Sequence, residues 1–264
     1  MMTVWERLRQ CRWQNAAWLC ASAALVFGGS VAPGALANDA SMPLKEFCAV
    51  PDDLKPAGFL KRTRDSYRAG KPFRIVVIGT SSSAGTGSAA RGEAYAARLQ
   101  GYLEQHFTLP VTVMNVSVGG QSARRMAVRF EDDVISKQPA LVIWQTGTVD
   151  AARNMEVEDF GQALSQGIEI LDKEGIDVVL INMQYSRRME LLVNHWPYVE
   201  RMKAAAVQSD AVLFDRLEMM RYWAAEGRLD FDNMPRAERA SRAVKLHECI
   251  ALQLGDMIEK AVRR

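Results

Sequence analysis

The chain has little of several residue types that mark well-known classes of binding protein. Its charge is nearly balanced, with 33 Lys and Arg against 31 Asp and Glu, so it lacks the basic excess that is typical of nucleic-acid-binding proteins. It has only 4 cysteines and 3 histidines, and these are not spaced as metal ligands. We therefore expect no nucleic-acid partner, no metal and no cofactor.

Long hydrophobic runs are also missing. The first apolar run extends from Ala16 to about Phe27, whereas a membrane-spanning helix needs about 20 apolar residues. An arginine-rich start precedes this run and Ala35-Leu36-Ala37 follows it, in the order of a secretory signal peptide. We expect residues 1–37 to be cleaved, leaving a periplasmic or secreted protein without a stable membrane span. An uncleaved N-terminal anchor is the alternative.

Cys48 and Cys249 are the two cysteines outside the predicted signal peptide. An even pair in an oxidising compartment indicates a disulfide. Closing so long a loop stabilises by up to about 5 kcal/mol in the chain-entropy model. Two buried free thiols are the alternative.

The remaining sequence alternates between short apolar runs and amphipathic stretches. Short apolar runs are typical of strands buried on both faces, and they occur at residues 74–79, 111–116, 141–145, 177–183 and 211–214. Helical periodicity occurs at residues 94–107, 123–136, 157–174, 197–208, 216–225 and 235–262. This alternation predicts an α/β fold, a three-layer α/β/α sandwich with a parallel sheet of about five strands. Residues 38–70 are expected to form a linker and a first helix, and residues 71–264 the main domain.

Catalytic and binding sites of such sheets form at the carboxyl ends of the strands. The first predicted strand ends in Gly79-Thr80-Ser81-Ser82-Ser83. A phosphate-binding loop at a helix N-terminus is one interpretation of this Ser- and Gly-rich segment. It lacks the lysine of a P-loop, its glycines do not fit G-x-G-x-x-G, and Ser83 breaks the G-x-S-x-G pattern of α/β-hydrolases.

The strand-end segments "IVVIGTSSSAG", "VMNVSVGGQSA" and "LVIWQTGT" occur in this order along the chain. Together they resemble the SGNH (GDSL-type) esterase superfamily, in particular a subgroup of exported proteobacterial members. The resemblance covers residues 70–264 and implies the flavodoxin-like SGNH hydrolase fold and hydrolysis of an ester substrate.

The resemblance also assigns roles to matching positions. Ser81 takes the place of the nucleophile, and Thr80 stands where the family usually has Asp. Gly120 takes the place of the oxyanion glycine, so the backbone N–H groups of Gly120 and Ser81 would face the developing negative charge. One such donor is worth about 3–4 kcal/mol of transition-state stabilisation.

The third block departs from the family pattern. Val149 stands where the family has an Asn donor, and a missing donor costs about 10²–10³ in rate. The adjacent Asp150 only accepts hydrogen bonds when it is ionised, so an anion facing the oxyanion would oppose catalysis. We expect the substrate-binding residues to be Thr148, Val149, Gln184 and His195. Gln184 could equally only close the sheet edge.

The family's Asp-x-x-His pair before the last helix is absent. His247 is the nearest candidate base, with Glu238 as its supporting carboxylate, although a core-facing histidine fits its helical pattern equally well. His195 offers a second route to the site, against the alternative of an exposed loop residue. His106 is expected to be structural or solvated.

Two functions follow from these observations. The first is an exported serine ester hydrolase or acyltransferase that acts on acyl or acetyl esters, of envelope polysaccharide or lipid, through Ser81. The second is a catalytically impaired binding or assembly protein of the cell envelope that retains the SGNH scaffold.

Overall fold

The computed structural model describes residues 42–85 and 91–263. The predicted signal peptide, residues 1–37, lies outside the described residues. The strands are β1 (Phe73–Ile78), β2 (Val111–Asn115), β3 (Leu141–Gln145), β4 (Asp177–Ile181) and β5 (Val212–Phe214). The α-helices are α1 (Leu44–Phe47), α2 (Lys61–Arg68), α3 (Tyr95–His106), α4 (Ala123–Ala127), α5 (Thr148–Ala152), α6 (Val157–Lys173), α7 (Arg187–Leu192), α8 (Trp196–Gln208), α9 (Arg216–Ala225) and α10 (Arg239–Arg263).

The five strands form one parallel sheet in the order β2-β1-β3-β4-β5. All side chains of β3 and β4 are buried, which explains why these strands are apolar runs without alternation. The change of direction in strand order falls at β1 and β3, and ligands of such sheets bind at this point, beyond the carboxyl ends of the strands.

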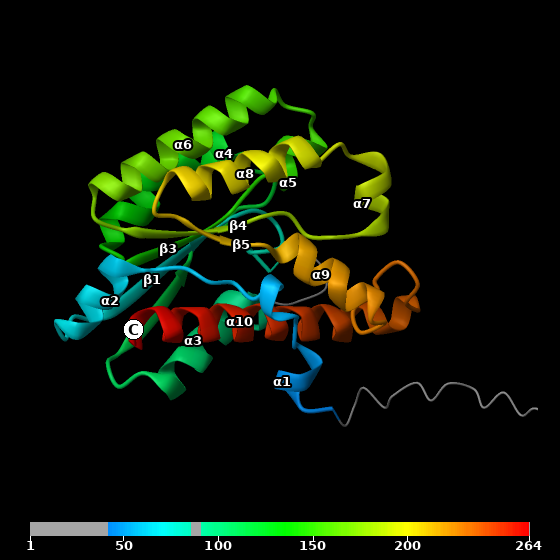
Figure 1. Ribbon diagram of the computed structural model, residues 1–264, viewed down its shortest axis with the longest axis horizontal. Coiled ribbons are helices and arrows are strands. Elements are labelled where there is room, and N and C mark those ends of the chain that lie inside the picture. Colours follow the sequence, from blue (N-terminus) through cyan, green and yellow to red (C-terminus); the bar gives the residue numbers. More distant parts are fainter. Residues whose placement is uncertain (1–41, 86–90, 264) are drawn as a thin grey trace, which may run out of the picture. The chain divides into compact units, whose positions relative to one another are not determined.

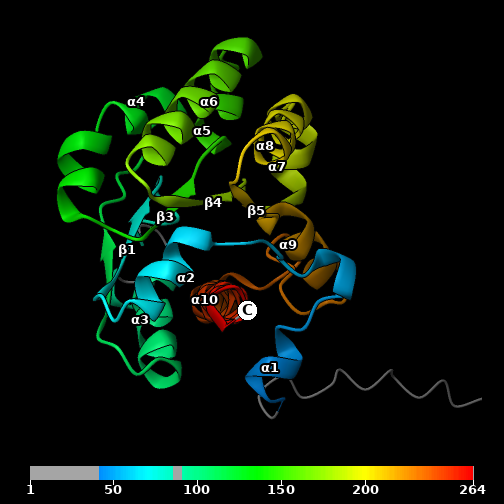
Figure 2. The ribbon, with the colours of Figure 1, turned by 60° about the vertical axis from the view of Figure 1, so that its left-hand side comes forward.

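Successive side chains of each strand enter two separate cores. Ile143 lies in the core formed with α3, α9 and α10, and Trp144 lies in the core formed with α4, α6 and α8. Figures 1 and 2 show these helices on opposite sides of the sheet, with α3 and α10 packed alongside each other. The predicted α/β sandwich with a parallel five-stranded sheet is therefore confirmed.

One predicted helix is broken in the structure. Residues 123–136 form the short helix α4, then a π-helical turn over Phe130–Val134 and a 3-10 turn over Ile135–Lys137. The π-turn places Phe130 and Val134 in the core, and Phe130 packs edge-on against Trp144. The local geometry therefore follows the packing of these two side chains, which periodicity alone does not reveal.

The segment before β1 is part of the packed structure. Phe47, Cys48 and Leu60 are fully buried in the core beneath α10. Cys48 and Cys249 form a disulfide that ties this segment to α10. Within the described ranges, no helix is both long enough and apolar enough to cross a membrane.

Candidate active site

Three turns meet at the carboxyl edge of the sheet, one after each of β1, β2 and β3. The turn after β1 spans Ser81–Gly85. The backbone N–H of Val118, after β2, donates to the carbonyl oxygen of Gly79 at 3.0 Å and joins the first two turns. Sequence analysis placed the site at this edge, and the structure brings Ser81, Gly119 and Gly120 together there.

Ser81 is exposed, and its hydroxyl faces Gly119. A Cβ atom at position 119 would lie 2.8 Å from Ser81 Oγ, so a larger residue there would collide with the hydroxyl. Gly120 has φ of +75°, a conformation that glycine adopts without strain. Gly119 is thus explained by the approach of this turn to Ser81, and Gly120 by its positive φ. The guanidinium of Arg153 lies beside the same turn, 3.8 Å from a Cβ built on Gly120.

Gln145, the last residue of β3, holds the Ser81 turn from below. Its side chain is fully buried, and Oε1 accepts the backbone N–H of Thr80 at 3.0 Å. The hydroxyls of Thr80, Ser82 and Ser83 also lie within 3.1–3.3 Å of this oxygen. Because the Thr80 N–H can only donate, the amide orientation is fixed, with oxygen toward the turn.

Ser82 and Ser83 also form contacts with other elements. Ser83 Oγ lies 2.8 Å from the hydroxyl of Tyr95, and the Asn115 amide donates to the Ser83 carbonyl oxygen at 2.7 Å. Burial raises the pKa of Tyr95 to about 12, so it remains a neutral phenol. Arg216 Nη1 donates to Ser82 Oγ at 3.1 Å. Four elements besides β1, namely β2, β3, α3 and α9, therefore position the segment that carries Ser81.

Asp150 has a different role from the one expected. Its carboxylate is 1% exposed and accepts the N–H of Ala123 at 3.1 and 3.2 Å. Burial raises its pKa, and hydrogen bonds from the backbone N–H groups of Ala123, Asp150 and Gly147 oppose that shift. The carboxylate thus secures the start of α4, directly after the Gly119-Gly120 turn, and ties the second and third turns together.

His247 is buried, with 9% of its surface exposed. Its Nδ1 accepts the backbone N–H of Tyr95 at 3.2 Å. Burial, together with the positive charges of Arg216 and Arg98, lowers its pKa to about 4. A neutral imidazole that accepts at Nδ1 carries its proton on Nε2, so Nε2 is a donor. In this arrangement His247 supports Tyr95 and cannot take the proton of Ser81.

Glu238 is not brought to His247. The two residues are nine positions apart in the sequence, and Glu238 ends the 3-10 turn before α10. That separation corresponds to about 13 Å along a helix, which is too far for a hydrogen bond. The carboxylate next to His247 in sequence is that of Glu248, which pairs with Arg98 at 2.9 Å and with Lys245 at 3.1 Å.

The other two histidines have contacts of their own. His195 is 3% exposed, so it is not an exposed loop residue. Its Nδ1 lies 3.1 Å from the Val193 carbonyl oxygen, and its Nε2 has no partner in the part of the chain that is described. His106 stacks on Tyr102. None of these contacts joins an imidazole to the Ser81 hydroxyl.

The remaining predicted binding residues lie on two strand ends. Thr148 and Val149 are partly buried in the first turn of α5, and Gln184 is exposed after β4. Gln184 and His195 line the same small space beside α7. Among residues 42–85 and 91–263, no group of three or more His, Cys, Asp or Glu side chains could hold a metal ion.

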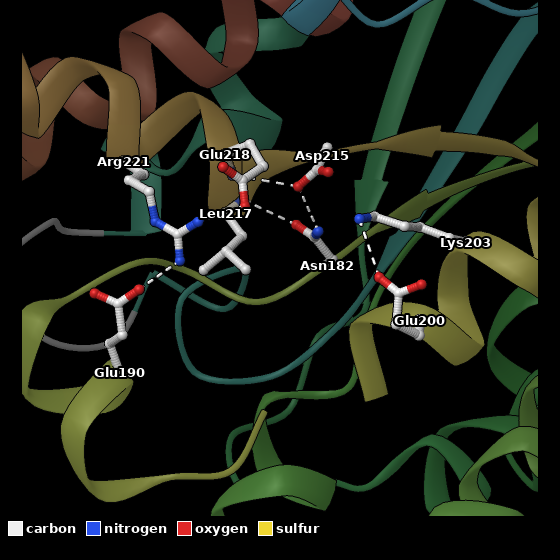
Figure 3. A network of polar contacts seen from close by, with 8 residues as sticks. All are labelled: Asn182, Glu190, Glu200, Lys203, Asp215, Leu217, Glu218 and Arg221. Atoms are coloured by element: carbon white, nitrogen blue, oxygen red, sulfur yellow. Dashed lines mark hydrogen bonds and ion pairs between the residues drawn. The ribbon is translucent and has the colours of Figure 1, made fainter. Parts of the chain in front are cut away.

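A polar network connects the ends of β4 and β5 with α7. Asn182 donates to Asp215 at 2.6 Å and accepts the N–H of Leu217 at 2.9 Å. Asp215 also accepts the N–H of Glu218 and caps α9. Figure 3 shows this cluster next to the Glu190–Arg221 ion pair, which ties α7 to α9. The network fixes the first turn of α9, of which Arg216 is the first residue.

Sequence reasoning missed Gln145, Tyr95 and Arg216. Gln145 carried a usable signal, because it is a polar residue that ends an apolar run at the carboxyl edge of a predicted strand. Arg216 follows the fifth predicted strand in the same way. Neither signal reveals which turn the side chain reaches, because that depends on how the strands are ordered in the sheet.

Three known structures have a similar fold. TesA has a TM-score of 0.56 and 22% identity, over 70% of this chain and 99% of that chain. The acetylxylan esterase Axe2 from Geobacillus stearothermophilus has a TM-score of 0.58 and 18% identity, over 70% and 94%. The lipase/acylhydrolase from Enterococcus faecalis has a TM-score of 0.58 and 18% identity, over 71% and 96%. At these identities the likeness establishes the SGNH hydrolase fold.

No curated protein sequence matches the chain significantly. The model of one protein family, described as the Non-GDSL lipase-like family, matches residues 47–264. This match includes every strand of the sheet and the three turns that surround Ser81. The chain belongs to the Non-GDSL lipase-like family.

Proposed function

We propose that this protein is a serine ester hydrolase in which Ser81 is the nucleophile. The observation that carries the proposal is the exposed Ser81 hydroxyl, which faces Gly119 on a turn anchored by Gln145. Gly120, with φ of +75°, follows Gly119 directly. The backbone N–H groups of Ser81 and Gly120 are the proposed oxyanion donors.

In the proposed reaction, Ser81 Oγ attacks the carbonyl carbon of the ester and forms a tetrahedral intermediate. The intermediate collapses to an acyl-enzyme and releases the alcohol, and water then hydrolyses the acyl-enzyme. Because His247 Nδ1 is occupied by the Tyr95 N–H, we assign the serine proton to solvent water at the exposed Ser81. We therefore expect slow hydrolysis whose rate rises with pH above neutrality, without the plateau that an imidazole base produces.

For the substrate we propose acyl or acetyl esters of envelope polysaccharide or lipid, reached by an exported protein. The fold neighbours support an ester, since one is named an acetylxylan esterase and another a lipase/acylhydrolase. The family description also names lipase-like proteins. Export rests on the signal-peptide pattern of residues 1–37.

Hydrolysis of p-nitrophenyl acetate by the wild-type chain and by Ser81→Ala tests the proposal. We expect the wild type to exceed the variant by at least tenfold, and a fluorophosphonate probe to label the peptide that contains Ser81. Ser165→Ala is the matched control, because it removes an exposed serine hydroxyl on α6, outside the Ser81 turn. Equal rates for wild type and Ser81→Ala, with no labelled peptide, would refute the nucleophile.

A binding or assembly protein on the SGNH scaffold is the second candidate. Two observations favour it: Val149 replaces the Asn donor, and His247 is engaged with Tyr95. This candidate predicts a folded chain without esterase activity and without labelling at Ser81. The same two assays therefore separate the candidates.

A further inference from the structure

Arg216 is a buried guanidinium beneath the Ser81 turn. It is 2% exposed and is the first residue of α9. Its Nη1 donates to Ser82 Oγ at 3.1 Å, whereas Nε and Nη2 have no hydrogen-bond partner within the described residues. Burying a charge in this way is costly unless the charge is paired, so this arrangement requires an explanation.

Among residues 42–85 and 91–263, no carboxylate forms an ion pair with Arg216. The titratable groups that interact with it are the phenol of Tyr95 on α3 and the imidazole of His247 on α10. Asp215 is adjacent in sequence, but its carboxylate accepts from Asn182 and from the Glu218 N–H, as Figure 3 shows. Arg98 also acts on His247, but its own charge is paired with Glu248.

Holding the Ser82 hydroxyl does not by itself require a cation. A neutral amide donor would make the same hydrogen bond at a lower desolvation cost. The retained positive charge therefore points to a negative charge that develops nearby during function. Ser81 is adjacent to Ser82, with Cα atoms about 3.8 Å apart, and its oxygen becomes anionic when it attacks an ester.

We propose that Arg216 is a positioning residue that activates Ser81: its unpaired charge stabilises negative charge on the Ser81 oxygen and on the adjacent oxyanion, while its hydrogen bond holds Ser82. This inference rests on the proposed function and deepens it. It assigns to a buried cation part of the activation of the serine hydroxyl that an imidazole base provides in Ser-His hydrolases. The contribution is electrostatic and acts before and during attack.

The full-length Ser81→Cys variant measures this field without any need for esterase activity. Alkylation by iodoacetamide is followed against pH, and mass spectrometry quantifies the peptide that contains position 81, so the other cysteines do not interfere. A free thiol titrates at about 8.5, and a nearby cation lowers that pKa by about one unit or more. We expect a thiol pKa near or below about 7.5.

Charge and hydrogen bond are separated by two further variants in the Ser81→Cys background. Arg216→Gln keeps a donor for Ser82 but removes the charge, and should slow alkylation at pH 7 by about tenfold. Arg216→Lys keeps the charge and should stay within about threefold of the parent. Arg98→Gln is the matched control, because it removes a cation whose charge is already paired with Glu248; it should leave the thiol pKa unchanged.

A thiol pKa at or above 8.5 with Arg216 present would overturn the inference, and so would equal alkylation rates for Arg216 and Arg216→Gln. If Arg216→Gln does not fold, as judged by circular dichroism, the thiol pKa of the parent decides alone. In the wild-type background, Arg216→Gln should lower kcat for p-nitrophenyl acetate by about tenfold with little change in KM. Absence of hydrolysis by the wild type together with a lowered thiol pKa would refute the proposed function and leave the electrostatic inference standing.

Discussion

Replacing Gln145 with leucine tests whether one buried side chain holds the Ser81 turn. Leucine has a similar size but no hydrogen-bonding atoms. The backbone N–H of Thr80, which now donates to Gln145 Oε1 at 3.0 Å, would be left buried without a partner. The Thr80 hydroxyl, at 3.1 Å, would lose its acceptor, whereas Ser83 keeps its contact with Tyr95 at 2.8 Å.

The magnitude follows from these separate losses. An unsatisfied buried N–H costs about 1–3 kcal/mol, and a lost hydroxyl hydrogen bond about 1 kcal/mol. The added apolar burial of leucine offsets part of this cost. We therefore expect Gln145→Leu to lower the free energy of unfolding by about 2–4 kcal/mol, which leaves a typical domain folded.

Gln145→Leu should also slow the reaction of Ser81, because the turn that carries its hydroxyl would shift. A reacting atom that is misplaced by about 1 Å can lose about 10²-fold in rate. We expect fluorophosphonate labelling of Ser81 to slow by about 10- to 100-fold in Gln145→Leu. Urea unfolding and labelling rates of the same preparation measure both quantities.

Gln253→Leu is the matched control for this experiment. Gln253 is also buried, at 8% exposure, and its amide donates to the Cys48 carbonyl oxygen at 2.8 Å. This site lies by the disulfide and not by the Ser81 turn, so the control should lose about 1 kcal/mol or slightly more and label at the wild-type rate. If Gln145→Leu labels as fast as Gln253→Leu, Gln145 does not position Ser81.

Three further predictions concern stability. The pKa of His247 falls from its usual 6.5 to about 4 on folding. Between these two pH values the imidazole is protonated in the unfolded chain and neutral in the folded chain. Between pH 6.5 and 4 the wild type should therefore lose about 3 kcal/mol more than His247→Gln; parallel stability curves of the two proteins would contradict this. Removal of the disulfide by the double substitution Cys48→Ser and Cys249→Ser should lower the free energy of unfolding by up to about 5 kcal/mol, measured in urea, and an unchanged midpoint would exclude a stabilising role. Asp150→Ala should cost about 2–4 kcal/mol by leaving the buried Ala123 N–H without an acceptor; Asp150→Asn retains one acceptor oxygen and should cost less, and equal losses for the two variants would argue against that hydrogen bond.

The parallel α/β sandwich could be predicted because its signals are local. The runs at residues 141–145 and 177–183 are apolar throughout, which is typical of strands covered on both faces. The observed β3 matches its predicted range, and β4 ends two residues early at Ile181. The position of Ser81 at the carboxyl edge followed from the same reasoning, since the turn comes directly after a strand.

The sequence by itself determined the order of strands and helices, the pair of cysteines that form the disulfide, and the strand-end turns that meet around Ser81. Only the tertiary structure decided which side chains form hydrogen bonds with that turn. Gln145 and Arg216 lie 64 and 135 positions from Ser81 in the sequence. Gln145 reaches the turn because β3 pairs directly with β1, and Arg216 reaches it from the start of α9, after the edge strand β5. The tertiary structure also turned His247 toward the Tyr95 N–H. Hydrogen bonds between residues so distant in sequence leave no periodicity, because they depend on how packed elements meet in space.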